Sequence, residues 1–244
     1  MKTFNTFNIS LKSVSVVWFL PIGLSILVLT GCTSTGYKKG DAAAIASQTA
    51  AAEVQAEART LELSMAALND LLNKPNPDLK PQFQRFSQSV DELIRATQWT
   101  DRTARGMQQR NTAYLKTWNK ELGQMNYQAI RDRSAARKAE VSSQLETINR
   151  QYREARAAVQ PLIAYLEDIR RALSADLTNR GLEAVRASAG NANGNSEKLQ
   201  AALGSLAAQL TASSASMSSF AWQKSGSEEK PAAAALRSQK GEAN

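Results

Sequence analysis

The chain has 244 residues with 30 Lys and Arg against 22 Asp and Glu, which gives a formal net charge of +8. It contains no histidine and one cysteine, so its composition excludes a Ser-His-Asp triad, a histidine-ligated metal, an internal disulfide and a zinc ribbon. Only 12 Gly and 6 Pro argue against an all-β sandwich with many turns. Composition therefore assigns no biochemical activity.

Residues 1–31 have the pattern of a secretory signal peptide. Lys2 and Lys12 precede an uncharged run over residues 14–30, and small residues follow it. A cationic start, an apolar run and a small-residue end are the three parts of such a peptide. The alternative is an uncleaved membrane anchor, but this run is interrupted by Pro21 and is short for a span of about 20 residues.

The end of the apolar run resembles the bacterial lipobox, an aliphatic residue and two small residues before a cysteine, here Leu29, Thr30, Gly31 and Cys32. The resemblance implies cleavage after Gly31 and a covalent lipid on Cys32, and we expect no other cofactor and no metal. Several acyl chains on one cysteine anchor a protein stably. Thr33 stands where Gram-negative lipoproteins retained in the inner membrane usually have Asp, so the resemblance favours the periplasmic face of the outer membrane.

The first part of the body predicts a tether and one long helix. Residues 32–40 have no apolar pattern, so we expect a flexible lipidated tether that ends at Asp41, a candidate N-cap. Apolar or small side chains then recur every three to four residues up to Asn73, which indicates one helix face. Pro75 and Pro77 end that helix.

The second segment covers residues 79–122 and alternates steps of three and four residues without a break. This repeat predicts a coiled-coil seam. Thr97, Thr100 and Asn111 are polar positions within the seam, and we interpret them as residues that fix helix register. Gly123 is a candidate C-cap.

Two further segments have the same spacing. The third begins near Asn126 and contains Pro161, which predicts a kink rather than an end because the repeat continues beyond it. In the fourth, Asn and Gly are frequent over residues 190–195, so we expect a frayed or broken helix there. The apolar pattern stops after Trp222, and residues 223–244 are expected to be disordered.

Together these segments predict the fold class. Four amphipathic segments joined by short loops pack against one another in antiparallel order. We therefore expect an all-α fold, an elongated antiparallel coiled-coil-like bundle of about four long helices over residues 41–222.

Short motifs within this bundle point to a family. In chain order they are Phe83-Gln-Arg-Phe86, Trp118-Asn-Lys-Glu-Leu122, Arg131-Asp-Arg-Ser-Ala135 and Val159-Gln-Pro-Leu162. With the lipobox, they resemble the bacterial helical lipoproteins called domain of unknown function 2959, over most of residues 41–220. The resemblance implies an envelope location and a helical body, and it transfers no catalytic residue.

Side chains that could support catalysis are sparse. The sequence contains no Gly-rich phosphate loop and no GxSxG motif. Adjacent carboxylates, such as Asp91 with Glu92 and Glu167 with Asp168, point in different directions on a helix. We interpret them as solvated charges and expect no enzyme activity.

Basic side chains gather around the second predicted turn. Residues 95–138 hold ten Lys and Arg against three Asp and Glu, a net charge of +7. The predicted basic tip comprises Arg102, Arg105, Arg110, Lys116, Lys120, Arg131, Arg133, Arg137 and Lys138. The same stretch holds Trp99, Tyr114, Trp118 and Tyr127. The second helix should return toward the anchored end of the first, which would bring this tip near the membrane; an ordinary solvated surface is the alternative.

Three functions remain open at this point. The leading hypothesis is a non-enzymatic cell-envelope lipoprotein that acts as a rod-like structural spacer or as an adaptor for another envelope protein. The second is a peripheral module whose basic tip binds anionic phospholipid or peptidoglycan. The third is an unrecognised enzyme. Nucleic acid is not expected as a partner, because secretion would separate the two.

Overall fold

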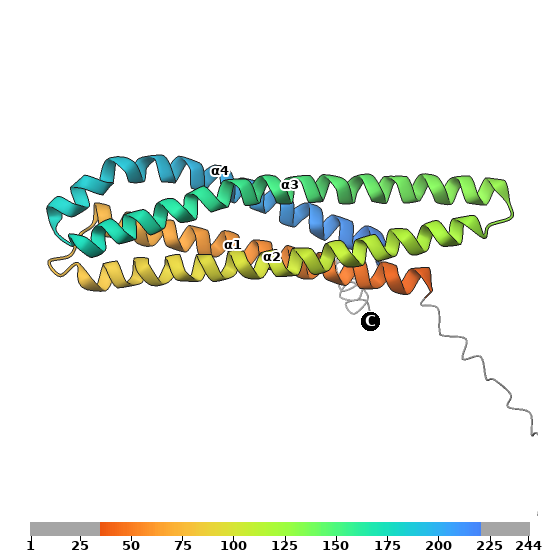
Figure 1. The fold of residues 1–244 in the computed structure, drawn as a ribbon, viewed down its shortest axis with the longest axis horizontal. Coiled ribbons are helices and arrows are strands. Elements are labelled where there is room, and N and C mark those ends of the chain that lie inside the picture. The colour runs from red at the N-terminus through yellow and green to blue at the C-terminus, as the bar shows by residue number, and fades with distance from the viewer. Residues whose placement is uncertain (1–34, 221–244) are drawn as a thin grey trace, which may run out of the picture. The chain divides into compact units, whose positions relative to one another are not determined.

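The computed structural model describes residues 35–220, which form four α-helices. They are α1 (Gly36–Asn73), α2 (Lys80–Gly123), α3 (Gln128–Ala175) and α4 (Asn179–Met217) (Figure 1). No strand occurs in this range, so the predicted all-α fold is confirmed. The predicted signal peptide, Cys32 and the C-terminal tail from residue 223 lie outside the described residues.

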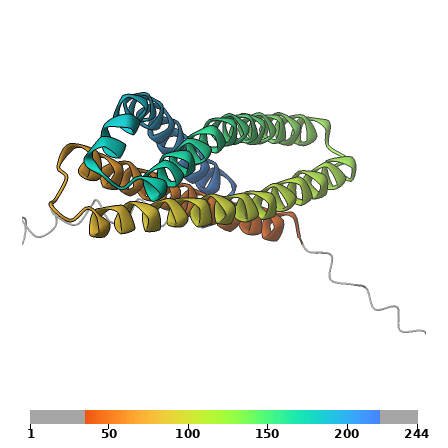
Figure 2. The same ribbon diagram turned by 60° about the vertical axis from the view of Figure 1, so that its left-hand side comes forward.

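The four helices form an antiparallel bundle in which each helix packs between two neighbours. α1 contacts α2 and α4, and α3 contacts α2 and α4 as well; Figure 2 shows the four helices from a second side. One cluster of buried apolar side chains from all four helices fills the space between them. None of the helices over residues 35–220 has an apolar run long enough to span a bilayer.

The seam predicted for the second helix is the buried face of α2. Phe86, Val90 and Leu93 are fully buried, as the three- and four-residue spacing requires. The polar seam positions Thr97 and Thr100 are also buried. Side-chain periodicity therefore located the core of this helix correctly, including the positions where polar residues enter it.

The start of the bundle differs from the prediction. α1 begins at Gly36 rather than at Asp41, so residues 36–40 are helical and not part of a tether. The reason is tertiary packing: Gly40 is buried, and a Cβ at this position would lie 3.2 Å from Tyr114 Cε2 and 3.1 Å from the Met217 carbonyl oxygen. Contacts with α2 and α4 extend the helix beyond its apolar pattern.

Asp41 does not cap α1. Its carboxylate accepts hydrogen bonds from the backbone N and the Oγ of Ser219, at 2.7 and 2.9 Å. These bonds tie the segment that follows α4 to the beginning of α1. At the other predicted cap, Gly123 is the last residue of α2 and Gln124 takes the C-cap position.

The Asn- and Gly-rich patch over residues 190–195 is helical, contrary to the prediction. α4 continues through it without a break. Asn193 and Asn69 of α1 exchange two side-chain hydrogen bonds, at 3.1 and 3.2 Å, and Ala189 and Ala192 are buried in the core. Packing against α1 thus outweighs the low helix propensity of this patch.

Pro161 lies inside α3, and the helix continues beyond it to Ala175, as predicted. The ribbon of α3 changes direction part-way along its length (Figure 1). A proline removes one backbone hydrogen bond and is a usual cause of such a bend.

The turn between α1 and α2 is closed by a buried side chain. Gln82 is 2% exposed. Its Nε2 donates to the Lys74 carbonyl oxygen at 2.9 Å and to Asp70 Oδ2 at 3.0 Å, and its Oε1 accepts from the backbone N of Asn76 at 2.9 Å. These bonds satisfy polar groups that the end of a helix leaves unpaired.

Candidate functional site

The hairpin of α2 and α3 is the predicted tip of the bundle. Figure 1 shows this hairpin extending past the start of α1 and the end of α4. Gly36 lies beside it, since a Cβ at Gly36 would be 4.0 Å from Glu121 Cγ. The α2–α3 turn therefore shares one end of the bundle with the first residues of α1. We call residues 116–140 the α2–α3 tip.

Six of the nine predicted basic residues lie in the α2–α3 tip. They are Lys116, Lys120, Arg131, Arg133, Arg137 and Lys138. Against them stand Glu121, Asp132 and Glu140, so the tip has a local charge of +3. Lys38 and Lys39 at the start of α1 add positive charge at the same end.

The other three predicted basic residues lie away from the tip. Arg102, Arg105 and Arg110 precede Gly123 by 13 to 21 positions, which at 1.5 Å per residue places them about 20–32 Å along α2. Arg102 stacks on the exposed Trp99 ring, 4.8 Å from its centroid. The predicted nine-residue tip is therefore a six-residue tip and a separate basic stretch on the shaft of α2.

The basic side chains of the tip differ in their contacts. Arg137 pairs with Glu140 at 2.9 Å and donates to the Ser216 carbonyl oxygen of α4 at 3.2 Å. In contrast, Lys116, Lys120 and Arg133 are exposed and form no ion pair with any residue of the 35–220 range. These three charges are available to an external anion.

Two of the four predicted aromatic residues are structural. Tyr114 and Trp118 pack against the core with ring centroids 5.3 Å apart, and Trp118 Nε1 donates to Ser134 Oγ of α3 at 2.9 Å. Burial raises the pKa of Tyr114, in keeping with this role. Tyr127 at the tip is instead 77% exposed, and Ile130 beside it is 60% exposed. Ile130 was missed from the sequence, although a large apolar residue outside the seam is a visible signal.

A second cluster lies inside the bundle, and the sequence analysis missed it. Glu57 of α1 is 0% exposed. It forms a buried ion pair with Arg156 of α3 and accepts a hydrogen bond from Thr97 Oγ1 of α2 at 3.1 Å. Glu57 stands three residues after Val54 and four before Leu61, so its spacing identifies it as a core position despite its charge.

Two neighbours extend this cluster. Asp101 Oδ1 lies 3.3 Å from Arg156 Nε and accepts a hydrogen bond from the Tyr152 hydroxyl. Burial, and then the hydrogen bond to Asp101, raise the pKa of Tyr152. Burial lowers the pKa of Arg156, but its hydrogen bond and charge interaction with Glu57 more than offset this and the pKa is raised. Buried ionic groups of this kind can specify helix register, which matches the interpretation of the polar seam.

Three of the four carboxylates considered for catalysis are engaged in ion pairs, whereas Glu92 is exposed and forms none with any residue of the 35–220 range. Asp91 and Glu167 both pair with Arg170, at 2.6 and 3.5 Å, and Asp168 pairs with Arg171 at 2.6 Å. Within residues 35–220, no group of three or more acidic or cysteine side chains is placed to hold a metal ion.

Comparison with known proteins gives one positive result. The family model described as protein of unknown function (DUF2959) matches residues 30–221. No curated protein and no solved structure matches the chain. The matched range includes all four helices and both candidate clusters, and it confirms the resemblance seen in the sequence motifs. The chain therefore belongs to the DUF2959 family.

Proposed function

We propose that this protein is a lipid-anchored, non-enzymatic component of the bacterial cell envelope whose α2–α3 tip contacts the anionic surface of the membrane that holds it. The observation that carries the proposal is the shared end of the bundle, where the start of α1 lies beside Glu121 and the basic hairpin projects beyond it. The proposed membrane is the outer membrane, on its periplasmic face.

The length of chain between the anchor and the bundle limits how far the tip can be from the membrane. Cys32, the proposed lipidation site, precedes Gly36 by four residues. Four residues span at most about 14 Å. A lipid on Cys32 would therefore keep the first turn of α1, and the tip beside it, within reach of the headgroups, and the charges of the tip would supply the contact itself.

Charge and exposure favour this contact over a purely solvated tip. Each Lys or Arg near an anionic surface contributes about 1 kcal/mol, and salt screens this attraction. Lys116, Lys120 and Arg133 supply such charges, and Tyr127 adds an amphipathic ring of the kind enriched at membrane interfaces.

The spacer or adaptor hypothesis has less support from the surface. Among the large exposed apolar side chains outside the tip, Ile45 and Leu63 are 59–64% exposed, but 18 positions separate them, about 27 Å along α1. Isolated apolar residues of this kind are ordinary on a protein surface. A protein partner or peptidoglycan would instead bind the tip itself, and photo-crosslinking at position 126 in cells would separate a protein partner from phospholipid.

The test measures the distance of the tip from the bilayer. The full chain with its native lipid anchor is reconstituted in vesicles that contain phosphatidylglycerol and spin-labelled lipid, with a fluorophore at Asn126 in the tip or at Asn179 at the opposite end. We expect quenching at position 126 and not at position 179. About 1 M salt, with a Debye length of about 3 Å, should abolish most of it.

A matched pair of variants tests the cause. In the first, Lys116, Lys120, Arg131 and Arg133 are all changed to Gln. In the second, four exposed arginines away from the tip are changed to Gln, namely Arg59, Arg95, Arg153 and Arg180. The two variants lose the same net charge, so only the first should lose quenching. Equal loss in both, or equal quenching at positions 126 and 179, would overturn the proposal.

A further inference from the structure

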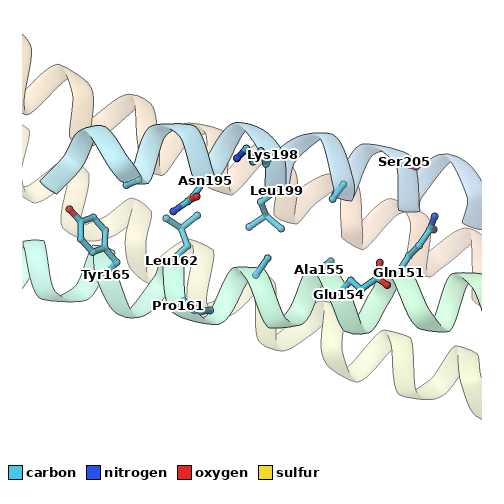
Figure 3. A pocket seen from close by; sticks show the side chains of 13 residues that line it. Gln151, Glu154, Ala155, Pro161, Leu162, Tyr165, Asn195, Lys198, Leu199 and Ser205 are labelled. Atoms are coloured by element: carbon cyan, nitrogen blue, oxygen red, sulfur yellow. The ribbon is translucent and has the colours of Figure 1, made fainter.

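A groove of about 690 Å³ runs between α3 and α4, outside both clusters described above. Figure 3 shows Ala155 and Leu162 of α3 facing Leu199 of α4 along its length. Ala158 and Ala202 also line it, and both are exposed. Small side chains on the two helices leave this space unfilled, and its surface is mainly apolar.

Polar groups stand at the ends and the rim of the groove. Tyr165 lies at one end and Gln151 at the other (Figure 3). The Tyr165 hydroxyl and Gln151 Oε1 are shielded from solvent and have no hydrogen-bond partner among residues 35–220. Such groups are costly when unpaired, so a ligand that accepted a hydrogen bond from the Tyr165 hydroxyl would satisfy that group.

The rim has an unbalanced positive charge. Lys198 of α4 is exposed and forms no ion pair within the described part of the chain. Glu154 across the groove has a partner in Arg150, at 4.0 Å. The groove therefore offers an ammonium group and a phenol donor to an anion, above an apolar floor.

The dimensions of the groove limit its occupant. From Gln151 to Tyr165, α3 rises about 21 Å. A volume of about 690 Å³ over this length gives a mean cross-section of about 33 Å², which is enough for one extended hydrocarbon chain. An extended single hydrocarbon chain therefore fits the groove along its length.

We propose that the α3–α4 groove binds a free long-chain fatty acid, with the hydrocarbon chain along Leu162 and Leu199 and the carboxylate toward Tyr165 and Lys198. Apolar floor, length, cross-section and rim charge agree on a single-chain anionic amphiphile. This site is separate from the α2–α3 tip, so either proposal can fail without the other.

The experiment uses the full chain in a detergent with a rigid steroid skeleton, which does not mimic a single acyl chain. Binding of cis-parinaric acid, a fluorescent fatty acid, is followed by its emission, and palmitate is added to displace it. We expect saturable binding with one site per chain. Changing Lys198 to Gln should weaken the binding of palmitate about tenfold, the usual effect of losing one charge-assisted hydrogen bond, and should leave the binding of the uncharged 1-hexadecanol unaffected.

Neighbouring alanines supply matched controls. Ala202→Trp would fill the groove, whereas Ala201→Trp changes the adjacent exposed residue outside it. We expect Ala202→Trp to weaken parinarate about tenfold or more and Ala201→Trp to change it less than about twofold, with both variants retaining the helical circular-dichroism signal. No saturable binding, equal effects of the two variants, or preference for a two-chain phospholipid over palmitate would overturn the proposal.

Discussion

The side chains that α1 buries differ between its two ends. Near the α1–α2 turn they are mostly large, whereas near the α2–α3 tip they are mostly small. The large residues that α1 and α2 bury near the turn are Leu61, Leu68, Leu71, Leu72, Phe86 and Leu93. The small residues that α1 buries near the tip are Gly40, Ala43, Ala44, Ser47, Ala50 and Ala51. The buried pair of Glu57 and Arg156 lies between the two halves.

This difference means that the two ends of α1 contribute unequally to the stability of the bundle. Burial of a Leu or Phe side chain contributes about 1.5–3 kcal/mol, so most hydrophobic stabilisation by α1 comes from the half near the turn. That half is also closed by the hydrogen bonds of Gln82. In the tip half α1 buries smaller residues, and the α2–α3 hairpin carries exposed charge beyond it.

The largest loss of stability should follow from removing the buried ion pair between Glu57 and Arg156, which lies between the two halves. Glu57→Leu leaves Arg156 buried without its main partner, and we expect a loss of about 3–5 kcal/mol in the free energy of unfolding. Urea denaturation followed by circular dichroism measures this. The double change Glu57→Leu with Arg156→Met should recover most of the loss, because the unpaired charge is then absent.

The control for that experiment is an exposed ion pair. Asp168→Ala breaks the exposed pair with Arg171, and we expect a change of less than about 1 kcal/mol. If Glu57→Leu cost no more than Asp168→Ala, the buried pair would not be the boundary that we describe.

A slightly smaller loss of stability should distinguish the large-residue end of α1 from its small-residue end. Leu68→Ala removes a side chain that is 0% exposed, and we expect a loss of about 2–5 kcal/mol from the lost burial and the cavity that remains. Ala51→Gly in the tip half should cost about 1 kcal/mol, mainly through helix propensity. Equal losses in thermal or urea unfolding would contradict the proposed division of stability.

The smallest expected change is an increase, rather than a loss, in the free energy of unfolding. Ser47 is fully buried, and its Oγ has no hydrogen-bond partner among residues 35–220. Ser47→Ala removes the desolvated hydroxyl and should raise the free energy of unfolding by about 1 kcal/mol. A decrease would show that the hydroxyl forms a favourable bond and that the tip half is better packed than we infer.

The sequence predicted the fold because helix periodicity is a local property. The spacing of Phe86, Val90 and Leu93 defines one face of α2 without knowledge of its neighbours, and the structure buries that face. Pro75 and Pro77 likewise marked the first turn, where α1 has ended and α2 has not begun. Family membership followed from motifs of the same local kind.

Other features depend on contacts that no local pattern contains. α1 starts at Gly36 because Gly40 packs against α2 and α4, and α4 stays helical because Asn193 pairs with Asn69, 124 residues away in sequence. The partners of Glu57 come from two other helices. The groove also needs two helices side by side, so its lining could not be assembled from either helix alone.

The contact between the α2–α3 tip and the membrane is the central claim, and photo-crosslinking in living cells tests it most directly. A photo-reactive residue replaces Asn126, which is exposed in the α2–α3 turn, and the native lipid anchor is kept. We predict adducts to phospholipid at position 126 and none at Asn179. A discrete protein adduct at position 126 without lipid adducts, or no adduct at all, would contradict the claim, and the protein adduct would favour an adaptor.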